Sequence, residues 1–244
     1  MKQGTFEIRS NVALTATVYK MILAGDTSAI TGPGQFVNIQ LDGFYLRRPI
    51  SVNDCVGDEL TIIYKVVGKG TEAMAAMTPG QTLDVLTGLG NGYDLSKAGD
   101  RPLLIGGGVG VPPLYMLARL LREAGKEVTV ILGFNTASEI FYEAEFKALG
   151  CSVTVTTVDG SYGTKGFVTD ALPGHYTHFC TCGPEPMLKA VYRATNTSGQ
   201  MSFEERMGCG FGACMGCSCK TLTGYKRICK DGPVMRKEEI AWNV

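Results

Sequence analysis

The sequence is poor in histidine and tryptophan and carries no excess charge of either sign. His175 and His178 are the only histidines, and neither sits in a recognisable Ser–His–Asp arrangement. The 23 Lys and Arg residues balance the 23 Asp and Glu residues in a chain of 244. This balance argues against the basic surface of a nucleic-acid-binding protein and against the polybasic patch of a membrane-surface protein.

Long apolar runs are also missing. The first ten residues, MKQGTFEIRS, carry charges where a signal peptide would be apolar. The longest uncharged stretch of interest, Pro102–Ala118, has 17 residues and contains four glycines and three prolines. A spanning helix needs ~20 apolar residues. We therefore expect a cytoplasmic protein with no membrane segment, whose thiols stay reduced.

Cysteine, by contrast, is abundant. Nine cysteines are present, and five of them fall between Cys209 and Cys229. In a reducing compartment such a group indicates a metal or redox site rather than a disulfide framework, and the odd total also argues against complete pairing. The order Cys209-x4-Cys214-x2-Cys217, followed after eleven residues by Cys229, has the spacing of a plant-type 2Fe-2S cluster.

A structural zinc ion is the alternative, because zinc also accepts four thiolates. Zinc sites usually pair two C-x2-C knuckles, and only one such pair occurs here, so the spacing favours iron and sulfide. Small residues between the cysteines leave room for backbone N–H groups to approach the sulfides. We predict Cys209, Cys214, Cys217 and Cys229 as ligands and Cys219 as a non-ligand.

Residues 1–99 have the pattern of an antiparallel β-barrel or sandwich. Short β-rich runs alternate with turn residues such as Gly32-Pro33-Gly34 and Pro79-Gly80. The expected strands are Val12–Leu23, Phe36–Gln40, Arg48–Val52, Glu59–Val67 and Gln81–Leu86, with one short helix at Thr71–Met77. We expect this part to form the first domain.

Residues 100–200 change to a βαβ rhythm, which predicts a parallel sheet with helices on both faces. The expected strands are Leu103–Ile105, Val128–Phe134, Val153–Val158 and His178–Thr181, and the expected helices are Pro112–Ala124, Ser138–Leu149 and Glu185–Ala194. Asn196–Gly199 is the predicted linker to a small cysteine-rich domain at residues 201–244.

Two turns of the α/β part are candidates for a nucleotide. The first, Gly106–Pro113, follows an apolar strand and opens a helix, where free backbone N–H groups favour a pyrophosphate. It lacks the full G-x-G-x-x-G pattern, so a tight crossover without a ligand is the alternative. The second, Cys182-Gly183-Pro184, has the same setting. Ligands bind at the carboxyl ends of parallel strands, so we expect both turns to face one crevice.

The barrel part carries its own candidate. In Arg47-Arg48-Pro49-Ile50-Ser51, two guanidinium groups precede an apolar strand. Arg48 could neutralise the pyrophosphate of a flavin dinucleotide while Ser51 donates a hydroxyl near the ring, and two arginines on a solvated edge are the alternative. Gly68-Lys69-Gly70-Thr71 precedes a short helix, a second place where N–H groups could meet a phosphate.

In their order along the chain, these motifs resemble the ferredoxin–NADP reductase-like family, and within it the electron-transfer subunits of NAD-dependent (class 1B) dihydroorotate dehydrogenases. The resemblance covers essentially the whole chain and implies a flavin-binding barrel, a parallel-sheet NAD-binding domain and a terminal 2Fe-2S domain. The FAD site it implies consists of Arg48, Pro49, Ile50, Ser51, Ile63, Tyr64, Lys65, Gly70 and Thr71. The nicotinamide nucleotide site it implies consists of Gly107, Gly108, Val109, Gly110, Cys182, Gly183 and Pro184. Lys65 stands where relatives often have Arg, which keeps the charge but loses the planar fork.

The resemblance also implies a reaction and a partner. A catalytic subunit would oxidise dihydroorotate at its own FMN, and electrons would pass through the 2Fe-2S cluster and FAD to NAD+. The implied assembly is a heterotetramer of two subunits of each kind in pyrimidine biosynthesis, with residues 201–244 forming much of the interface. The alternatives are the flavin and iron–sulfur subunit of a sulfide dehydrogenase, or of a ferredoxin-linked NAD(P)H oxidoreductase. A redox-sensing module and a zinc-stapled nucleotide-binding protein are more distant alternatives.

The sequence favours NAD over NADP. The loops that follow the second and third strands of the α/β part, Gly133–Ala137 and Asp159–Ser161, lack the arginine expected beside a 2′-phosphate. Asp159 would repel that phosphate.

Overall fold

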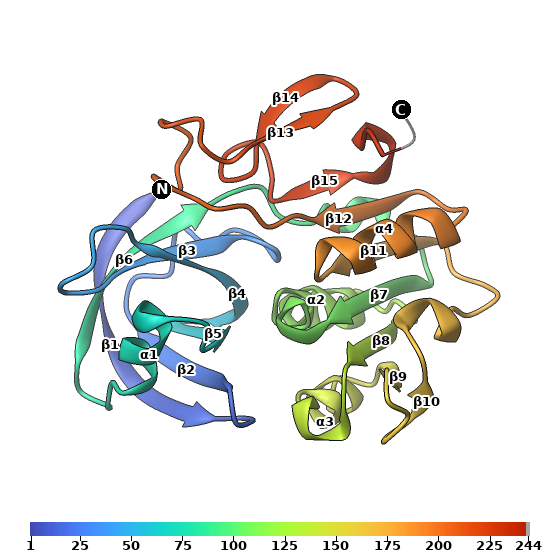
Figure 1. The fold of residues 1–244 in the computed structure, drawn as a ribbon, viewed down its shortest axis with the longest axis horizontal. Coiled ribbons are helices and arrows are strands. Elements are labelled where there is room, and N and C mark those ends of the chain that lie inside the picture. Colours follow the sequence, from blue (N-terminus) through green and yellow to red (C-terminus); the bar gives the residue numbers. More distant parts are fainter. Residues whose placement is uncertain (243–244) are drawn as a thin grey trace.

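The computed structural model describes residues 1–242. Figure 1 shows a barrel on the left, an α/β domain on the right and a C-terminal segment that lies across the top of both. A closed six-stranded antiparallel barrel and a mainly parallel sheet are the two scaffolds, which confirms the expected fold class. No helix within residues 1–242 is long and apolar enough to cross a membrane.

The barrel closes in the strand order β1-β2-β5-β4-β3-β6. Alternate residues point inward, as in β3, where Val37 and Ile39 are fully buried. Because every strand has two neighbours, the barrel exposes no unpaired edge. Its elements are β1 (Lys2–Ala13), β2 (Val18–Ala24), β3 (Phe36–Gln40), β4 (Arg48–Val56), β5 (Glu59–Lys65), α1 (Lys69–Ala75) and β6 (Thr82–Leu89).

One barrel prediction is wrong. The run Val12–Leu23, expected as a single strand, is divided between β1 and β2 by a tight turn at residues 14–17. The backbone N–H of Leu14 donates to the carbonyl of Val18 at 2.8 Å, and that of Val18 donates to the hydroxyl of Thr15 at 3.1 Å. The turn contains neither glycine nor proline, so the strong local signals for a turn are missing.

The α/β domain has the sheet order β10-β9-β8-β7-β11-β12-β15. Leu104 and Val130 face α2 and α3, whereas Leu103 and Ile131 face α4, so both faces are covered as expected. Its elements are β7 (Pro102–Gly107), η2 (Gly108–Gly110), η3 (Pro112–Leu114), α2 (Tyr115–Glu123), β8 (Thr129–Phe134), η4 (Ala137–Glu139), α3 (Glu143–Ala148), β9 (Ser152–Thr157), β10 (Thr164–Lys165), η5 (Val168–Ala171), β11 (His178–Cys182) and α4 (Glu185–Ala194).

The helix expected at Ser138–Leu149 is interrupted. Tyr142 has a left-handed backbone with φ of 68°, and the α-helix α3 begins only at the next residue. The side chain of Tyr142 explains this departure, because its ring packs against Tyr115 and its hydroxyl accepts a hydrogen bond from Asn53 at 3.0 Å. Tertiary packing therefore overrides the local helical pattern.

The C-terminal segment is joined to the α/β sheet. It contains β13 (Ser218–Thr221), β14 (Gly224–Arg227), β15 (Val234–Arg236) and η6 (Lys237–Glu239). The strand before it, β12 (Gly199–Ser202), pairs in parallel with β11 and antiparallel with β15. The boundary expected between residues 200 and 201 therefore falls inside a strand, and part of the predicted linker is in the sheet. Residues 243 and 244 of the predicted third domain lie outside the described residues.

The barrel and the α/β domain are held together by polar contacts. Arg119 of α2 forms an ion pair with Asp54 of β4 at 2.7 Å, and both side chains are mostly buried. The buried amide of Asn53 donates to Tyr142 as described above. These contacts place β4 against the start of α2, next to the glycine-rich turn.

Candidate cofactor and metal sites

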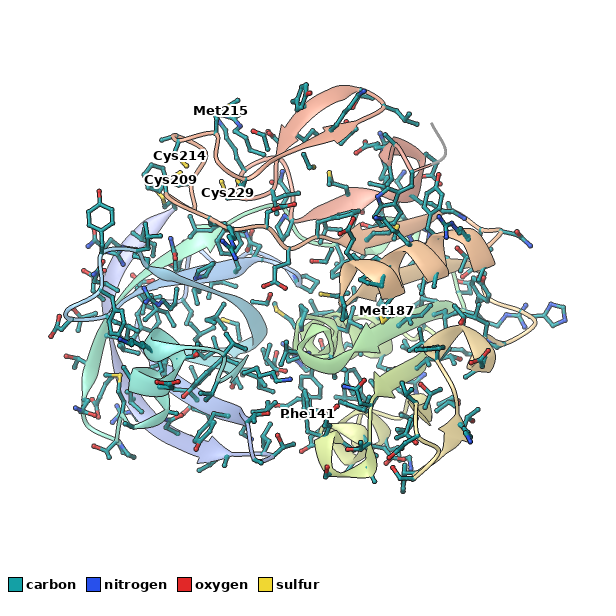
Figure 2. All side chains as sticks on the ribbon, in the orientation of Figure 1. Phe141, Met187, Cys209, Cys214, Met215 and Cys229 are labelled. Atoms are coloured by element: carbon teal, nitrogen blue, oxygen red, sulfur yellow. The ribbon has the colours of Figure 1, made fainter. Side chains whose placement is uncertain are left out.

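The cysteine loop (residues 209–217) lies between the barrel and the hairpin β13–β14. Figure 2 shows Cys209, Cys214 and Cys229 gathered above the barrel, with Met215 at the outer side of the loop. Cys217 and Cys229 are buried, whereas Cys214 is exposed. The predicted ligands belong to two separate stretches of the chain that lie next to each other, since the N–H of Cys229 bonds to Sγ of Cys217.

Backbone N–H groups point at the first sulfur of the loop. The N–H groups of Ala213 and Cys214 donate to Sγ of Cys209 at 3.2 and 3.4 Å. Burial raises the pKa of Cys209, but these donors and that of Phe211 outweigh burial and lower its pKa to about 6. The loop thus favours the thiolate, which is the form that binds metal.

The second pair of sulfurs is formed by Cys217 and Cys229. The N–H of Cys229 donates to Sγ of Cys217 at 3.4 Å. Burial, the hydrogen bond with Cys217 and the neighbouring thiols of Cys217 and Cys209 together raise the pKa of Cys229 to about 12. A cationic centre between these thiols would offset the repulsion between their thiolate forms and so favour their ionisation.

The predicted ligands interact mainly as two pairs of thiols. Cys209 interacts with Cys214, and Cys217 with Cys229, while Cys209 also raises the pKa of Cys229. A 2Fe-2S cluster takes two thiolates on each iron, so the ligand set stays a prediction with which this pairing is compatible. Within residues 1–242, no three His, Cys, Asp or Glu side chains lie close enough together to form a metal site as they stand. Cys219 lies on β13, partly buried among apolar side chains that include Ile228. Its predicted role as a bystander is compatible with that position.

Two glycines let the cysteine loop close. Gly210 and Gly212 have φ angles of 79° and 91°, a backbone that other residues rarely adopt. A Cβ on Gly210 would lie 2.4 Å from the amide nitrogen of Asn38, and one on Gly212 would lie 2.6 Å from the side chain of Lys230. The sequence therefore needs glycine at both positions.

The two arginines at the start of β4 have different surroundings. Arg47 is pinned to the barrel by an ion pair with Asp84 at 2.7 Å. The guanidinium of Arg48 lies 4.5 Å from the ring centre of Phe44 and directly against Gly70, where a Cβ would be 2.1 Å from its Nε. The structure thus brings together the predicted pyrophosphate residue Arg48 and the start of α1. The sequence favours Arg48 over Arg47 for this role, and within the described residues Arg47 is the one that forms an ion pair with a carboxylate, whereas Arg48 forms none.

The remaining predicted flavin residues divide between the two faces of the barrel wall. Ser51 and Ile63 lie on the outer face, and Ile63 packs with side chains of the α/β domain. Tyr64 points into the barrel, where its hydroxyl donates to Asn11 at 2.9 Å and burial raises its pKa to about 12. Only the backbone of Tyr64 is therefore available to a ligand outside the barrel.

Of the other four predicted flavin residues, Thr71 lies at the start of α1, Pro49 and Lys65 lie at the surface, and Ile50 packs against the barrel core. The hydroxyl of Thr71 is used locally, since it accepts from the N–H of Val67 at 2.9 Å and donates to the carbonyl of Gly68 at 2.9 Å. Lys65 and Pro49 are exposed, and Ile50 is half-buried.

The two glycine turns of the α/β domain touch each other. Gly106 of β7 pairs with Cys182 of β11, at the carboxyl ends of adjacent parallel strands. A Cβ on Gly110 would lie 2.3 Å from the carbonyl oxygen of Cys182 and 2.6 Å from Cα of Gly183. The two turns therefore lie side by side at one edge of the sheet, and the crevice expected between them stays a prediction. Gly108 adopts a left-handed backbone with φ of 52°, and Val109 is exposed at the tip of the turn.

Tyr93 and Met187 pack near Cys182 and the two glycine turns. Burial raises the pKa of the Cys182 thiol to about 12, so the thiol stays protonated at neutral pH. The hydroxyl of Tyr93 donates to the carbonyl of Thr181 at 3.0 Å. Sδ of Met187 fills the space beside Gly107, where a Cβ would lie 2.4 Å away. Sequence reasoning gave no role to Tyr93, which stands in no motif, or to Met187, which only ends the stretch that begins with the second glycine turn.

The three candidate parts meet along β3, β4 and the glycine-rich turn. Asn38 of β3 donates to the carbonyl of Cys209 at 3.2 Å, which joins the barrel to the cysteine loop. Next to β3, the strand β4 carries Arg48 and Ser51 and contacts η3, which follows the glycine-rich turn. The fold thus places the cysteine loop, the arginine–serine strand and the glycine-rich turn on neighbouring elements, with the arginine–serine strand in the middle.

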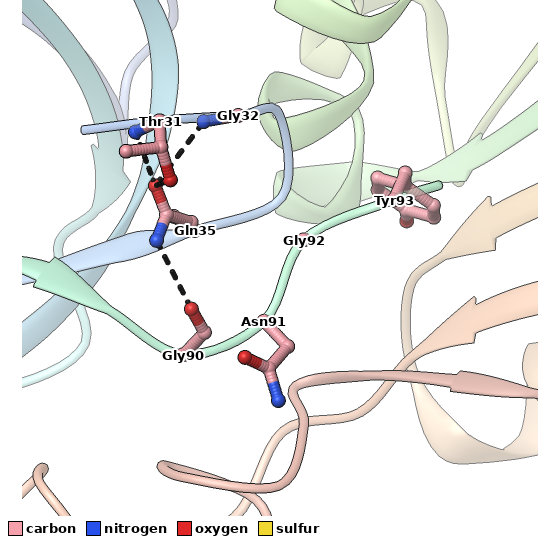
Figure 3. Close-up of a pocket in the computed structure, with 7 residues that line it drawn as sticks. All are labelled: Thr31, Gly32, Gln35, Gly90, Asn91, Gly92 and Tyr93. Carbon is pink, nitrogen blue, oxygen red and sulfur yellow. Dashed lines mark hydrogen bonds between the residues drawn. The ribbon is translucent and has the colours of Figure 1, made fainter. Parts of the chain in front are cut away.

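A separate polar pocket of about 250 Å³ lies where the barrel meets the connection to the α/β domain. Figure 3 shows Thr31, Gly32 and Gln35 on one side and residues 90–93 on the other. Gln35 bridges the two sides, accepting from the N–H of Thr31 at 2.7 Å and donating to the carbonyl of Gly90 at 3.1 Å. None of the predicted site residues lines it.

Comparisons with known proteins agree with this geometry. Residues 204–241 match the model described as the iron-sulfur cluster binding domain of dihydroorotate dehydrogenase B, and residues 104–193 match the oxidoreductase NAD-binding domain. A solved chain of NADH-dependent reduced ferredoxin-NADP oxidoreductase, described for flavin-based electron bifurcation, is 33% identical with a TM-score of 0.89, covering 98% of this chain and 90% of that one. A ferredoxin NADP+ reductase from Neisseria gonorrhoeae, solved with FAD and NADP, shares the fold at 18% identity and a TM-score of 0.69, covering 80% and 90%.

Curated relatives match over nearly their whole length. The dihydroorotate dehydrogenase B (NAD(+)) electron transfer subunit of Fusobacterium nucleatum is 44% identical, covering 98% of this chain and 99% of the relative. The subunit of the same name from Bacillus velezensis is 42% identical, covering 99% and 100%. At this identity and coverage, the chain belongs to the family of dihydroorotate dehydrogenase B electron transfer subunits.

Proposed function

We propose that this chain is the oxidoreductase subunit that passes electrons from a dihydroorotate-oxidising partner to NAD+ in pyrimidine biosynthesis. The observation that carries the proposal is the junction of three motifs, in which the cysteine loop, the arginine–serine strand and the two glycine turns lie on adjoining elements. When bound, a 2Fe-2S cluster accepts single electrons, and FAD pairs them for transfer to NAD+ as a hydride.

The residues of the chain bind and orient these groups. Cys209 and Cys214 hold one iron and Cys217 and Cys229 the other, while backbone N–H groups of the loop stabilise the thiolates. The small residues Gly208 and Gly216 lie beside Sγ of Cys214, at 3.3 and 3.5 Å from their Cβ positions, so they leave the sulfur accessible.

For FAD, the guanidinium of Arg48 and the N–H groups at the start of α1 bind the pyrophosphate. Ser51 and the backbone of residues 63–65 contact the ring from the outer face of the barrel. The glycine turns at residues 107–110 and 182–184 bind the nicotinamide nucleotide, and the protonated thiol of Cys182 lies beside its ring.

Selectivity for NAD rests on the loops after β8 and β9. The carboxylate of Asp159 accepts from the hydroxyl and the N–H of Ser161 at 2.6 and 2.9 Å, and these bonds lower its pKa. The hydroxyl of Ser161 in turn accepts from the N–H of Ala137 at 2.8 Å, so the two loops are joined. An ionised carboxylate at this edge disfavours a 2′-phosphate.

The partner in this proposal is a catalytic subunit with FMN, in a cytoplasmic heterotetramer of two subunits of each kind. The exposed apolar side chains of the C-terminal segment support an interface there, because Phe211, Met215 and Tyr225 are 45%, 54% and 76% exposed. A surface of this kind beside the cysteine loop would bring the partner close to the cluster.

Co-expression with an FMN-dependent dihydroorotate dehydrogenase subunit tests the proposal. The expected result is a stable complex in which dihydroorotate reduces NAD+. The second candidate, a subunit of a ferredoxin-linked oxidoreductase, is favoured by the 33% identity to the chain from the ferredoxin-NADP enzyme. Dihydroorotate-dependent NAD+ reduction would exclude it. If the chain does not bind that subunit but transfers electrons between NADH and ferredoxin, the first candidate is overturned.

A further inference from the structure

Asn38 lies at the only hydrogen-bonded junction between the barrel and the cysteine loop within the described residues. Its neighbours in β3, Val37 and Ile39, point into the barrel, so the side chain of Asn38 points outward to the loop. The side chain is buried, with 2% of Asn38 exposed, and its Nδ2 donates to the carbonyl of Cys209 at 3.2 Å. Gly210 packs directly on this amide.

The backbone of Asn38 faces the flavin side of the junction. It pairs with Pro49 in the arginine–serine strand, and its carbonyl accepts from the guanidinium of Arg47 at 3.2 Å. One residue therefore connects the cysteine loop to the segment that carries Arg48 and Ser51. By contrast, the bond from Arg227 to the carbonyl of Gly212 at 2.9 Å lies within the C-terminal segment.

The carbonyl oxygen of the same side chain, Oδ1, is buried without a hydrogen-bond partner among the described residues. A buried acceptor that lacks a donor destabilises a fold, so an apolar residue would serve the barrel better if packing were its only role. Packing in the barrel therefore does not explain an asparagine at this position, whereas its hydrogen bond to the cysteine loop does.

We propose that Asn38 is a positioning residue, which holds the ligand Cys209 against the flavin-binding strand and so fixes the separation of cluster and flavin. The inference rests on the proposed function, because it assumes that both groups are bound. The position of Cys209 matters because a functional site loses activity when the residues around it no longer hold its ligands in place and the ligands shift slightly.

The test compares Asn38→Ala and Asn38→Asp with Thr87→Val in the full chain purified with its cofactors. Thr87 of β6 is the matched control, because it is also a buried polar residue of the barrel, and its hydroxyl donates to a backbone carbonyl, that of Lys2 at 3.3 Å, which belongs to neither the cysteine loop nor Cys229. Asn38→Asp keeps the volume but replaces the donor with an acceptor that faces a carbonyl.

Two readouts separate positioning from general stability. Bleaching of the cluster by an iron chelator should accelerate about 2–10-fold in both Asn38 variants, the equivalent of one hydrogen bond. Rapid-mixing measurements should show flavin reduction by NADH at the wild-type rate and slower transfer from flavin to cluster. Thr87→Val should match the wild type in both.

Wild-type behaviour of both Asn38 variants would overturn the proposal. Failure of both to load FAD would also overturn it, because the role of Asn38 would then lie in forming the barrel. If the wild-type chain itself holds neither flavin nor cluster, the proposed function fails instead, and the absorbance spectrum of the unmutated protein distinguishes that case.

Discussion

The contact between the two glycine turns makes Gly110→Ala a sharp perturbation. The new Cβ would lie 2.3 Å from the carbonyl oxygen of Cys182, whereas ordinary contact begins near 3.4 Å, so the turns must separate by about 1.1 Å. The obstacle is backbone on both sides and does not yield by a rotamer change. Overpacking of this kind costs about 1–3 kcal/mol in the free energy of unfolding.

The effect on function should exceed the effect on stability. A displacement of about 1 Å in a site that orients reactants lowers the rate by up to ~10²-fold. We expect Gly110→Ala to keep its FAD and its cluster, because those sites lie on other elements, and to lose NADH-dependent flavin reduction. Stopped-flow absorbance at increasing NADH concentration measures this loss.

Gly174→Ala is the matched control, because a Cβ there meets no atom within 4 Å and the position has no left-handed backbone. It should retain the wild-type rate and melting temperature. If Gly110→Ala reduces its flavin with the wild-type dependence on NADH concentration, the glycine turns do not bind the nicotinamide nucleotide and this part of the account is refuted.

Three further predictions concern other parts of the chain. Arg48→Ala should weaken FAD retention about 10–100-fold, because a charge-assisted bond is lost. Arg47→Ala should leave FAD bound and lower the stability of the fold, because Asp84 loses its ion-pair partner. Fluorescence of the flavin released on dilution measures retention in both variants, and equal retention would contradict the assignment. Burial lowers the pKa of His178 despite the nearby carboxylates of Glu238 and Asp94, so the folded state binds fewer protons than the unfolded state. The free energy of unfolding should therefore fall as pH drops below about 6.5, and His178→Gln should reduce that fall in denaturant titrations. An unchanged dependence of the free energy of unfolding on pH in this variant would count against the prediction. Asp159→Ser should raise the rate with NADPH relative to NADH, and an unaltered ratio of the two rates would remove Asp159 from the selectivity argument.

The motifs with fixed local spacing could be predicted from the sequence. Cysteine spacing pointed to a loop and a more distant cysteine that the fold does place near each other, and glycine between a strand and a helix located the two turns that meet. These features depend on covalent spacing and on backbone freedom, which are properties of short stretches. The helix Glu185–Ala194 was likewise predicted at its observed bounds, since proline in its first turn marks the start.

Features that depend on distant partners could not be predicted. Asn38 stands in an ordinary strand, and its importance appears only when Cys209, far along the chain, comes to lie beside it. The break before α3 follows from the contact of Tyr142 with Asn53, and the pairing of β12 with β15 crosses the expected domain boundary. Such pairs leave no local pattern, because common polar and apolar residues form them.

FAD and a 2Fe-2S cluster on this one chain should exchange electrons with NADH. Anaerobic addition of NADH to the purified protein, followed by absorbance and by electron paramagnetic resonance, measures this exchange. We expect loss of both the flavin and the cluster absorbance, together with a paramagnetic signal from the reduced cluster. A colourless protein, or flavin reduction that never produces the cluster signal, would rule this electron path out.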